Sequence, residues 1–454
     1  MHGGAQESPH RRRNAIPRRG PQTAPSGGKT RILGLHSSRM KVGIIGLGYV
    51  GLPLAVAFAE AGHEVVGLDT DARVADRIRG GESTVEDVPS ERLTAVAERL
   101  LPTTDHAELG ACDAVLVCVP TPLANHRDPD LTYLVDAATS LSSVLGEGQL
   151  VVLESTTYPG TTRERLKPIL EESGLAAGRD FHLAYSPERI DPGRTDYTIR
   201  NTPKVVGGLT DACRDRAVAI YEEVCDEVLT VSTPEAAELA KLLENIFRSV
   251  NIALVNELAV LCDRMAIDVW EVVDAAATKP FGFMRFEPGP GMGGHCLPVD
   301  PFYLAFKARE HDFSTEFIEL AGKINQNQPQ FCVRKIERTL NEVSKPVKGS
   351  RILLLGVAYK AGVADVRESP ALKIIRNLRE LGAEIAYHDP HVAEIPELGM
   401  RSADLDEELP HADLACVITP HPEVDYRRVV EGSDLVLDFR GVTRGIEAAN
   451  LVRL

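Results

Sequence analysis

Short apolar runs alternate with amphipathic stretches along the chain from residue 40 onward. The first unit reads MKVGIIGLGYVGLPLAVAFAEAGHEVVGLDTD. It predicts a buried strand over residues 42–45, a glycine turn, a helix over residues 52–61 and a second strand over residues 63–68. Further apolar runs, CDAVLVCVPTPL, LVVLESTTYPGTT and FHLAY, predict buried strands separated by helices. Strands that alternate with helices are typical of a parallel sheet, so we expect an α/β fold.

The hydrophobic period changes between residues 234 and 266, where PEAAELAKLLENIFRSVNIALVNELAVLCDRMA predicts one long helix. Lys241, Asn245 and Arg248 are spaced by four and three residues, so they share one face of this helix. They form either a solvated polar stripe or part of a functional site. A helix of this length in the middle of the chain is expected to link two domains and to form a dimer interface.

A second α/β unit begins near residue 351 with RILLLGVAYKAGVADVRESPALKIIRNLRELGAEIAYHDP. It repeats the order strand, turn at Gly356, helix, strand and terminal acid Asp389, without a full GxGxxG. The expected fold class is therefore α/β, with two Rossmann-like doubly wound domains joined by a long central helix. Lys360 and Arg367 follow the first strand of the second domain, where they suit a substrate that bears phosphate.

The first 39 residues differ from the rest in composition. They hold eight lysines and arginines against one acid, Glu7, and no apolar period, so we expect a disordered basic extension. Met40 directly precedes the first strand. The extension is therefore either a basic arm that contacts an anionic partner or an artefact of the gene model, with translation starting at Met40.

Charge and cysteine usage restrict the function further. The net charge of −16 argues against a nucleic-acid partner. No run of 18 apolar residues is present, so we expect no membrane span. The eight cysteines are scattered without a CxxC pair, which indicates neither a structural metal site nor a disulfide framework. We expect a cytoplasmic protein without a metal.

The turn GLGYVG lies between a strand and a helix and predicts a dinucleotide site. Gly46 allows the tight turn, Gly48 lets a pyrophosphate approach, and Gly51 lets helix and strand pack closely. Asp69 ends the second strand, where it would accept hydrogen bonds from the ribose and repel a 2′-phosphate, so NAD is favoured over NADP. Thr121 and Thr156 follow later strands on the same side, either as cofactor contacts or as helix caps.

One cysteine stands in a loop that favours chemistry. The segment GPGMGGHCLPVDPFYL places Cys296 after Gly293 and Gly294 and four residues before Asp300. A thiolate in an accessible loop is a strong nucleophile, whereas most free cysteines are small buried apolar residues. A nucleotide cofactor together with a cysteine nucleophile suggests oxidation through a thioester.

The motifs GLGYVG, VPTP, ESTT with PGTT, SPER, ELAKLLEN, GGHCLPVDP and GVAYK occur together in this order. In this respect the chain resembles the UDP-glucose/GDP-mannose dehydrogenase family from Met40 to its end. The segment over residues 278–304 is most similar to the UDP-N-acetylglucosamine 6-dehydrogenase branch. Pro192 stands where the UDP-glucose enzymes carry a second glutamate, which fits that branch, whereas Arg285 and Glu287 depart from its pattern.

The resemblance implies a four-electron oxidation of a UDP-N-acetylhexosamine, with UDP-N-acetylglucosamine favoured, at carbon 6 by two NAD+. Cys296 would attack the intermediate aldehyde, and Lys241 and Asn245 would stabilise the oxyanion. Asp300 would orient Lys241 and a water, while Glu188 and Thr156 would position the water that hydrolyses the thioester. His295 is expected to pack or to contact substrate rather than to bind a metal.

The resemblance also implies the binding residues and the domain boundaries. The cofactor-binding residues would be Gly46, Gly48, Tyr49, Val50, Gly51, Asp69, Thr121, Thr156 and Arg367. The substrate-binding residues would be Glu188, Arg189, Ile190, Lys241, Asn245, Arg248, Gly291 and Lys360, with Arg440 on weaker grounds. Residues 40–230 would bind NAD, residues 231–340 would form the central and dimerisation domain with the cysteine loop, and residues 341–454 would bind the UDP-sugar. We expect a homodimer or a higher multiple.

Several alternatives remain open. The sugar could instead be UDP-N-acetylmannosamine or UDP-glucose. A two-electron hydroxyacid dehydrogenase shares the domain plan but needs no cysteine, and NAD stoichiometry would distinguish it. A non-catalytic NAD-binding protein would not need Lys241, Cys296 and Asp300 together.

Overall fold

A computed structural model describes residues 39–124, 128–191, 196–294, 297 and 299–454. The basic extension over residues 1–38, Pro192, His295 and Cys296 lie outside these described residues, so the expectations about them stay predictions. Residues 40–454 belong to one unit of the chain.

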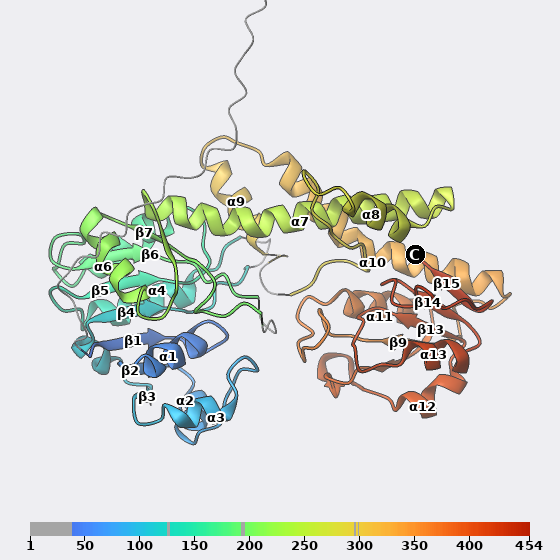
Figure 1. The fold of residues 1–454 in the computed structure, drawn as a ribbon, viewed down its shortest axis with the longest axis horizontal. Helices are drawn as coiled ribbons and strands as arrows, with labels where there is room; N and C mark the ends of the chain where they lie inside the picture. The colour runs from blue at the N-terminus through green and yellow to red at the C-terminus, as the bar shows by residue number, and fades with distance from the viewer. Residues whose placement is uncertain (1–38, 125–127, 192–195, 295–296, 298) are drawn as a thin grey trace, which may run out of the picture. The chain divides into compact units, whose positions relative to one another are not determined.

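The N-terminal half of this unit forms an eight-stranded sheet in the order β3-β2-β1-β4-β5-β6-β7-β8 (Figure 1). All neighbouring strands are parallel except β6 and β7, which are antiparallel. The order 3-2-1-4-5-6 is that of dinucleotide-binding sheets. The strands are β1 Lys41–Ile45, β2 Glu64–Leu68, β3 Leu100–Thr103, β4 Ala114–Val117, β5 Leu150–Leu153, β6 His182–Tyr185, β7 Lys204–Gly208 and β8 Val228–Val231.

Helices cover the faces of this sheet, which explains why its central strands are apolar along their whole length. The α-helices are α1 Gly51–Glu60, α2 Ala72–Arg79, α3 Ser90–Ala95, α4 Thr132–Ser142, α5 Lys167–Glu171 and α6 Asp211–Tyr221. The predicted unit of strand, glycine turn, helix and strand is confirmed, with boundaries within one residue of those expected. Strand β4 ends at Val117, before the end of the apolar run CDAVLVCVPTPL that predicted it.

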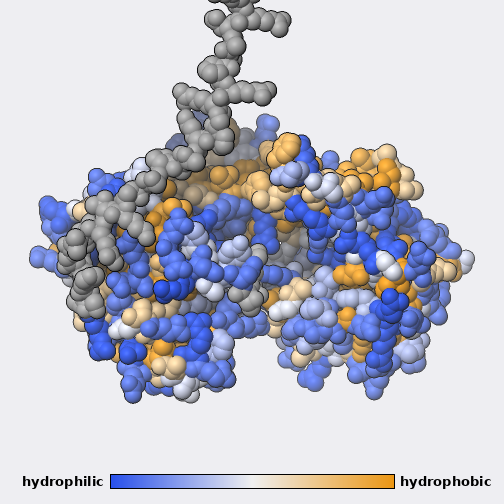
Figure 2. All heavy atoms as spheres, in the orientation of Figure 1, coloured by the Kyte–Doolittle hydropathy of each residue, from blue (hydrophilic) through white to orange (hydrophobic). Residues whose placement is uncertain are grey.

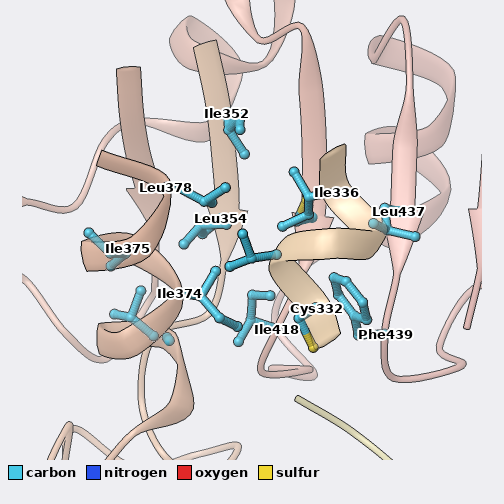
Figure 3. Close-up of a cluster of buried hydrophobic side chains, with 14 of the residues drawn as sticks. Cys332, Ile336, Ile352, Leu354, Ile374, Ile375, Leu378, Ile418, Leu437 and Phe439 are labelled. Carbon is cyan, nitrogen blue, oxygen red and sulfur yellow. The ribbon is translucent and has the colours of Figure 1, made fainter. Parts of the chain in front are cut away.

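The C-terminal part forms a five-stranded parallel sheet in the order β10-β9-β13-β14-β15. Figure 3 shows its core, in which Ile352 and Leu354 of β9 meet Ile374 and Leu378 of α11 and Ile336 of the helix α10 (Glu316–Glu342). The elements are β9 Arg351–Leu355, α11 Pro370–Glu380, β10 Glu384–His388, β11 Glu394–Ile395, β12 Met400–Arg401, α12 Leu405–Glu408, β13 Leu414–Val417, α13 Tyr426–Gly432, β14 Val436–Asp438 and β15 Leu451–Arg453.

The predicted long helix is α7 Pro234–Met265, which is followed by α8 Val269–Ala277, α9 Asp300–Arg309 and α10 Glu316–Glu342. Thr233 caps α7 by accepting a hydrogen bond from the Ala236 N–H, and the helix ends at Ala266 in the left-handed conformation. Its 32 residues give a length of about 48 Å. Helix α10 packs along α7, and Asn256 donates to Asn325 between them at 3.1 Å. The α/β class with a long central helix is confirmed.

Helix α7 is also long and apolar enough, by length and composition alone, to cross a membrane. The sequence analysis expected no membrane span, so this match was not predicted. The buried polar residues Glu238, Lys241 and Asn256 all hydrogen-bond to other elements of the fold. Such bonds are typical of a helix in the core of a folded domain, so the match is weak evidence for a membrane span.

Candidate active site

The turn after β1 has the geometry of a dinucleotide site. Gly46 has φ of +91°, and a Cβ there would lie 2.8 Å from the Cys118 carbonyl oxygen. A Cβ on Gly51 would overlap the Gly46 carbonyl oxygen, whereas a Cβ on Gly48 would meet nothing within 4 Å. Gly46 and Gly51 are therefore required by packing, and Gly48 faces open space at the start of α1, where a phosphate can approach the backbone.

The carboxylate of Asp69 is held at the end of β2. Its Oδ2 accepts a hydrogen bond from the Leu47 N–H at 3.0 Å and its Oδ1 accepts one from the Asp71 N–H at 2.9 Å. The acid is therefore fixed beside the glycine turn, as expected for a residue that binds the ribose of NAD. Val50 is half-buried, and the exposed Tyr49 carries the Arg367 guanidinium 5.4 Å above its ring. The described residues of this site fit NAD.

Two threonines follow β4 and β5, as predicted. Thr121 Oγ1 donates to the Thr156 carbonyl oxygen at 2.7 Å, so this hydroxyl joins the two strand ends rather than capping a helix. Thr156 is half-buried. The next residue, Thr157, is fully buried, and its Oγ1 has no hydrogen-bond partner among the described residues. Sequence reasoning missed Thr157, although the doubled threonine was a signal.

Helices α7 and α9 bring three predicted catalytic residues together. Asn245 Nδ2 donates to Asp300 Oδ2 at 2.5 Å. Lys241 Nζ donates to the backbone carbonyl of Glu188 at 2.5 Å. Burial raises the pKa of Asp300 to about 6, while the positive charge of Lys241 and the Asn245 hydrogen bond oppose that rise. Asn245 is therefore the direct partner of the Asp300 carboxylate, and the orientation of Lys241 by Asp300 stays a prediction.

Glu188 lies in the loop after β6. Its Oε1 accepts hydrogen bonds from the Arg189 N–H at 2.6 Å and the Ile190 N–H at 2.7 Å, and its Oε2 lies 3.4 Å from Lys204 Nζ. Burial pushes the pKa of Glu188 up, but Lys204 and the two N–H groups outweigh burial and bring it below the ordinary value. Arg189 pairs with Glu244 at 2.7 Å. Glu188 is thus ionised and held by the chain itself.

Two of the cations predicted to bind the substrate, Arg248 and Lys360, face one carboxylate. Arg248 Nη1 and Lys360 Nζ lie 3.5 Å and 3.1 Å from the carboxylate oxygens of Asp191. Asp191 was not predicted, because nothing in the sequence separates it from other loop acids. Arg440 is half-buried, and desolvation lowers the pKa of its guanidinium. Arg248 and Lys360 therefore place two positive groups beside one another, which suits an anionic ligand.

The glycines before Cys296 pack closely against the C-terminal part. A Cβ on Gly293 would lie 2.8 Å from Tyr359 Cβ, and one on Gly294 would lie 3.0 Å from the Tyr359 ring. Gly294 has φ of +90°, and its N–H donates to the Arg367 carbonyl at 3.2 Å. Gly291, with φ of +139°, packs near Pro370. Backbone conformation and close contact therefore explain the glycines of this loop.

The seven described cysteines are all buried and unpaired. Burial raises the pKa of Cys112 and Cys225 to about 11, so these thiols are poor nucleophiles at neutral pH. Cys296 lies outside the described residues, and in the sequence it stands between Gly294 and Asp300.

Comparison with known proteins identifies the family of the chain. Three models of the UDP-glucose/GDP-mannose dehydrogenase family match the chain. The NAD binding domain matches residues 40–225, the central domain residues 235–327, and the UDP binding domain residues 353–445.

Characterised relatives cover most of the chain. It is 39% identical over 361 residues to a UDP-N-acetyl-D-glucosamine 6-dehydrogenase of Pseudomonas aeruginosa, covering 78% of this chain and 83% of that protein. It is 34% identical over 427 residues to a UDP-N-acetyl-D-mannosamine dehydrogenase of Pyrococcus horikoshii, covering 89% and 100%. A solved structure of a UDP-D-ManNAc dehydrogenase from Pyrococcus horikoshii superimposes with a TM-score of 0.84 at 32% identity, covering 91% of this chain and 99% of that one. The chain therefore belongs to the UDP-glucose/GDP-mannose dehydrogenase family of NAD-dependent nucleotide-sugar dehydrogenases.

Proposed function

We propose that the protein oxidises carbon 6 of a UDP-N-acetylhexosamine, with UDP-N-acetylglucosamine favoured, to the carboxylate in two NAD-dependent steps through a thioester on Cys296. The observation that carries this proposal is the cluster of Lys241, Asn245 and Asp300 beside Glu188. In the sequence, the glycine loop and Cys296 come directly before Asp300 of this cluster.

The residues of the chain have distinct tasks in this proposal. NAD+ supplies the hydride acceptor in each of the two oxidations. In the first, the alcohol loses a proton and a hydride to give an aldehyde. The Cys296 sulfur then bonds to the aldehyde carbon, and Lys241 and Asn245 stabilise the negative oxygen. Loss of the second hydride leaves a thioester.

Hydrolysis completes the proposed sequence. A water oxygen attacks the acyl carbon, the carbon–sulfur bond breaks, and Cys296 leaves as a thiolate. Glu188 accepts the proton of the water, and Thr156 and the buried Thr157 help to position it. Asp300 stays close to the Lys241 charge throughout and keeps Asn245 oriented. Arg189, Ile190, Arg248, Gly291 and Lys360 hold the nucleotide-sugar.

The choice of an N-acetyl sugar rests on the relatives and on two features of the sequence. The matched relatives named above act on UDP-N-acetylglucosamine and UDP-N-acetylmannosamine. The segment over residues 278–304 favours the first, and Pro192 replaces a glutamate of the UDP-glucose branch. UDP-N-acetylmannosamine is the second candidate because it differs only in the direction of the amide.

Purified protein assayed with NAD+ against a panel of UDP-sugars tests the proposal. Two NADH per sugar and no released aldehyde are expected. A pocket built for the amide would leave a polar group unpaired with UDP-glucose, at a cost of about 1–3 kcal/mol. The preference for the N-acetyl sugar in kcat/KM is therefore expected to be about 5- to 150-fold. One NADH per sugar would exclude the thioester route, whereas a better kcat/KM with UDP-glucose would exclude only the sugar assignment.

Cofactor choice is expected to depend on Asp69. Its fixed carboxylate repels a 2′-phosphate, so kcat/KM with NAD+ should exceed that with NADP+ by about tenfold or more, the effect of about 1.4 kcal/mol. The variant Asp69→Asn should keep the hydrogen bond to the Leu47 N–H and narrow this ratio. Equal kcat/KM for both cofactors in the unchanged protein would contradict the role of Asp69.

We also propose that α7 pairs two copies of the chain. Figure 2 shows hydrophobic side chains gathered over the helical region that includes α7. The exposed apolar residues of α7 form a stripe along the helix: Leu239, Leu243, Phe247, Leu254, Leu261 and Met265. Leu243→Asp and Leu254→Asp together should convert a dimer to a monomer in sedimentation experiments, whereas Glu257→Gln on the same helix should not. A monomer before any substitution would contradict this assignment.

The reaction is proposed to take place in the cytoplasm. The unpaired thiols of the seven described cysteines support a reducing compartment. Cell fractionation followed by detection of the protein would test this location, and recovery in a membrane fraction would contradict it.

A further inference from the structure

A buried ionic cluster lies directly behind Glu188. Lys204, the first residue of β7, places its Nζ 2.7 Å from Glu154 Oε2 and 3.4 Å from Glu188 Oε2. Tyr221, the last residue of α6, donates its hydroxyl proton to the other oxygen of Glu154. The Lys204 Nζ also lies 5.1 Å from the centre of the Tyr221 ring. Three residues, Glu154, Glu188 and Tyr221, therefore surround the ammonium group of Lys204.

Burying these charged groups costs free energy unless each charge has a partner of opposite sign. The side chains of Lys204 and Glu154 are 6% and 0% exposed. A buried charge without a partner costs several kcal/mol, so the lysine needs both carboxylates to remain charged. Burial opposes the charge on Lys204, but Glu154 and Glu188 outweigh it and raise the pKa of the ammonium. Lys204 is thus a permanent positive charge inside the N-terminal sheet.

The two carboxylates that share Lys204 differ in the direction in which their pKa is shifted. Burial raises the pKa of Glu154 above its ordinary value despite Lys204, whereas the pKa of Glu188 is lowered because Lys204 and two backbone N–H groups outweigh burial. Glu154 is therefore the first of the pair to take up a proton, and Glu188 stays ionised. Ionised Glu188 is the form that can accept a proton from water.

We propose that Lys204 is a positioning residue for Glu188, which it holds ionised and fixed in the orientation required for thioester hydrolysis. This inference rests on the proposed function, which gives Glu188 its task. Glu188 is held at three points by its carboxylate and at a fourth by its carbonyl, which accepts from Lys241. Lys204 thereby connects the buried Glu154 and Tyr221 to the residue whose carbonyl binds the predicted catalytic lysine.

The charged and titratable groups around the Glu188 carboxylate are few. Lys204 faces it from β7, Glu154 from the end of β5, and Lys241 from α7. The thiols of Cys118 and Cys225 are also near, and both stay neutral because burial raises their pKa. Lys204 is the group that lowers the pKa of Glu188 most, so removal of Lys204 should raise the pKa of Glu188.

The test follows the acyl-enzyme on Cys296 in the full chain. Enzyme, NAD+ and UDP-N-acetylglucosamine are mixed and quenched in acid, and the mass of the intact protein reports the acylated fraction over time and pH. The variants are Lys204→Met, Lys204→Arg, Glu188→Gln and the double variant Lys204→Met with Glu154→Gln. The double variant removes the lysine without leaving Glu154 as an unpaired buried charge, so it keeps the test valid if the single variant fails to fold.

Loss of Lys204 is expected to move the pH at which decay of the acyl-enzyme is half-maximal about 1–3 units higher, which slows decay about 10-fold or more in mildly acidic solution and less at neutral pH. Lys204→Arg should restore most of the rate, and the formation of the first NADH should change less than threefold. The matched control is Lys335→Met, because Lys335 forms an equally buried pair with Asp263 at 2.5 Å between α10 and α7. It should leave the pH profile of decay unchanged.

The outcomes separate the two proposals. If Glu188→Gln accumulates acyl-enzyme but the Lys204 variants decay with the original pH profile, the role of Lys204 is wrong and the proposed function stands. If Glu188→Gln hydrolyses its acyl-enzyme normally, or no variant forms one, the hydrolytic role of Glu188 or the thioester itself is wrong. A smaller amount of acyl-enzyme in the Lys204 variants, with an unchanged pH profile of its decay, would show that Lys204 contributes only to folding.

Discussion

Replacing Lys241 with methionine is expected to lower kcat by about 10³-fold, within the range for removal of a general acid–base group or an oxyanion donor. Lys241 is nearly buried, and its ammonium reaches the Glu188 carbonyl at 2.5 Å. Methionine keeps the length and apolar character of the side chain, so α7 should remain folded. The loss should therefore lie mainly in kcat, measured from the rate of NADH formation, with the melting temperature changed by only a few degrees.

The pH dependence adds a second readout to this prediction. The charge of Lys241 opposes the burial that raises the pKa of Asp300 to about 6. Without it, the pKa of Asp300 should rise further, and the acid limb of any residual activity should move to higher pH. Lys323→Met on α10 removes a charge from an exposed lysine and serves as the control. A loss of kcat below tenfold in Lys241→Met would contradict a catalytic role for this lysine.

The pKa of Asp300 also determines whether this residue makes the fold more or less stable as the pH rises. The folded value, about 6, lies above the ordinary value of 3.8, so the fold favours the protonated acid. This group therefore stabilises the fold most at pH below 3.8, and the stabilisation is lost as pH rises through about 6. A carboxyl that is ionised at neutral pH although the fold favours its protonated form is typical of a functional site.

The sequence predicted the features that depend on local backbone geometry. Gly46 and Gly51 were recognised because a turn between strand and helix leaves no room for a Cβ, and the structure has those contacts. Helical spacing predicted that Lys241 and Asn245 share one face, and the family resemblance assigned them to the site; they do reach Glu188 and Asp300. In each case a short segment determines the position.

Other features depend on contacts between distant segments. Lys204 stands in a strand with apolar neighbours, and only the fold reveals that Glu154 and Tyr221 surround it. Asp191 was not foreseen because its partners are Arg248 of α7 and Lys360 of the C-terminal part. Single-sequence patterns contain periodicity but not these long-range pairings. A lysine at a buried strand position was still a usable signal, since such a charge requires partners.

Replacing Cys296 with alanine is expected to abolish formation of the uronic acid, with a loss in kcat of at least about 10³-fold, as is typical when a catalytic nucleophile is removed. Without the thiol no thioester can form, so the variant should yield at most one NADH per sugar, and the aldehyde should remain bound or be released slowly. Cys296→Ser should retain slow turnover, because an oxygen ester is harder to form and to hydrolyse than a thioester.

The other cysteines provide the control for this prediction. Cys213 at the start of α6 is buried like the remaining described cysteines, so Cys213→Ala should keep the full stoichiometry of two NADH per sugar. Intact-protein mass should detect an acylated adduct in the unchanged protein and in Cys213→Ala but not in Cys296→Ala. If Cys296→Ala still forms two NADH per sugar, the nucleophile is another residue. If the unchanged protein forms only one NADH per sugar and Cys296→Ala does not alter that ratio, the chain performs a two-electron oxidation. Lys241, Asn245 and Asp300 would then serve alcohol oxidation alone.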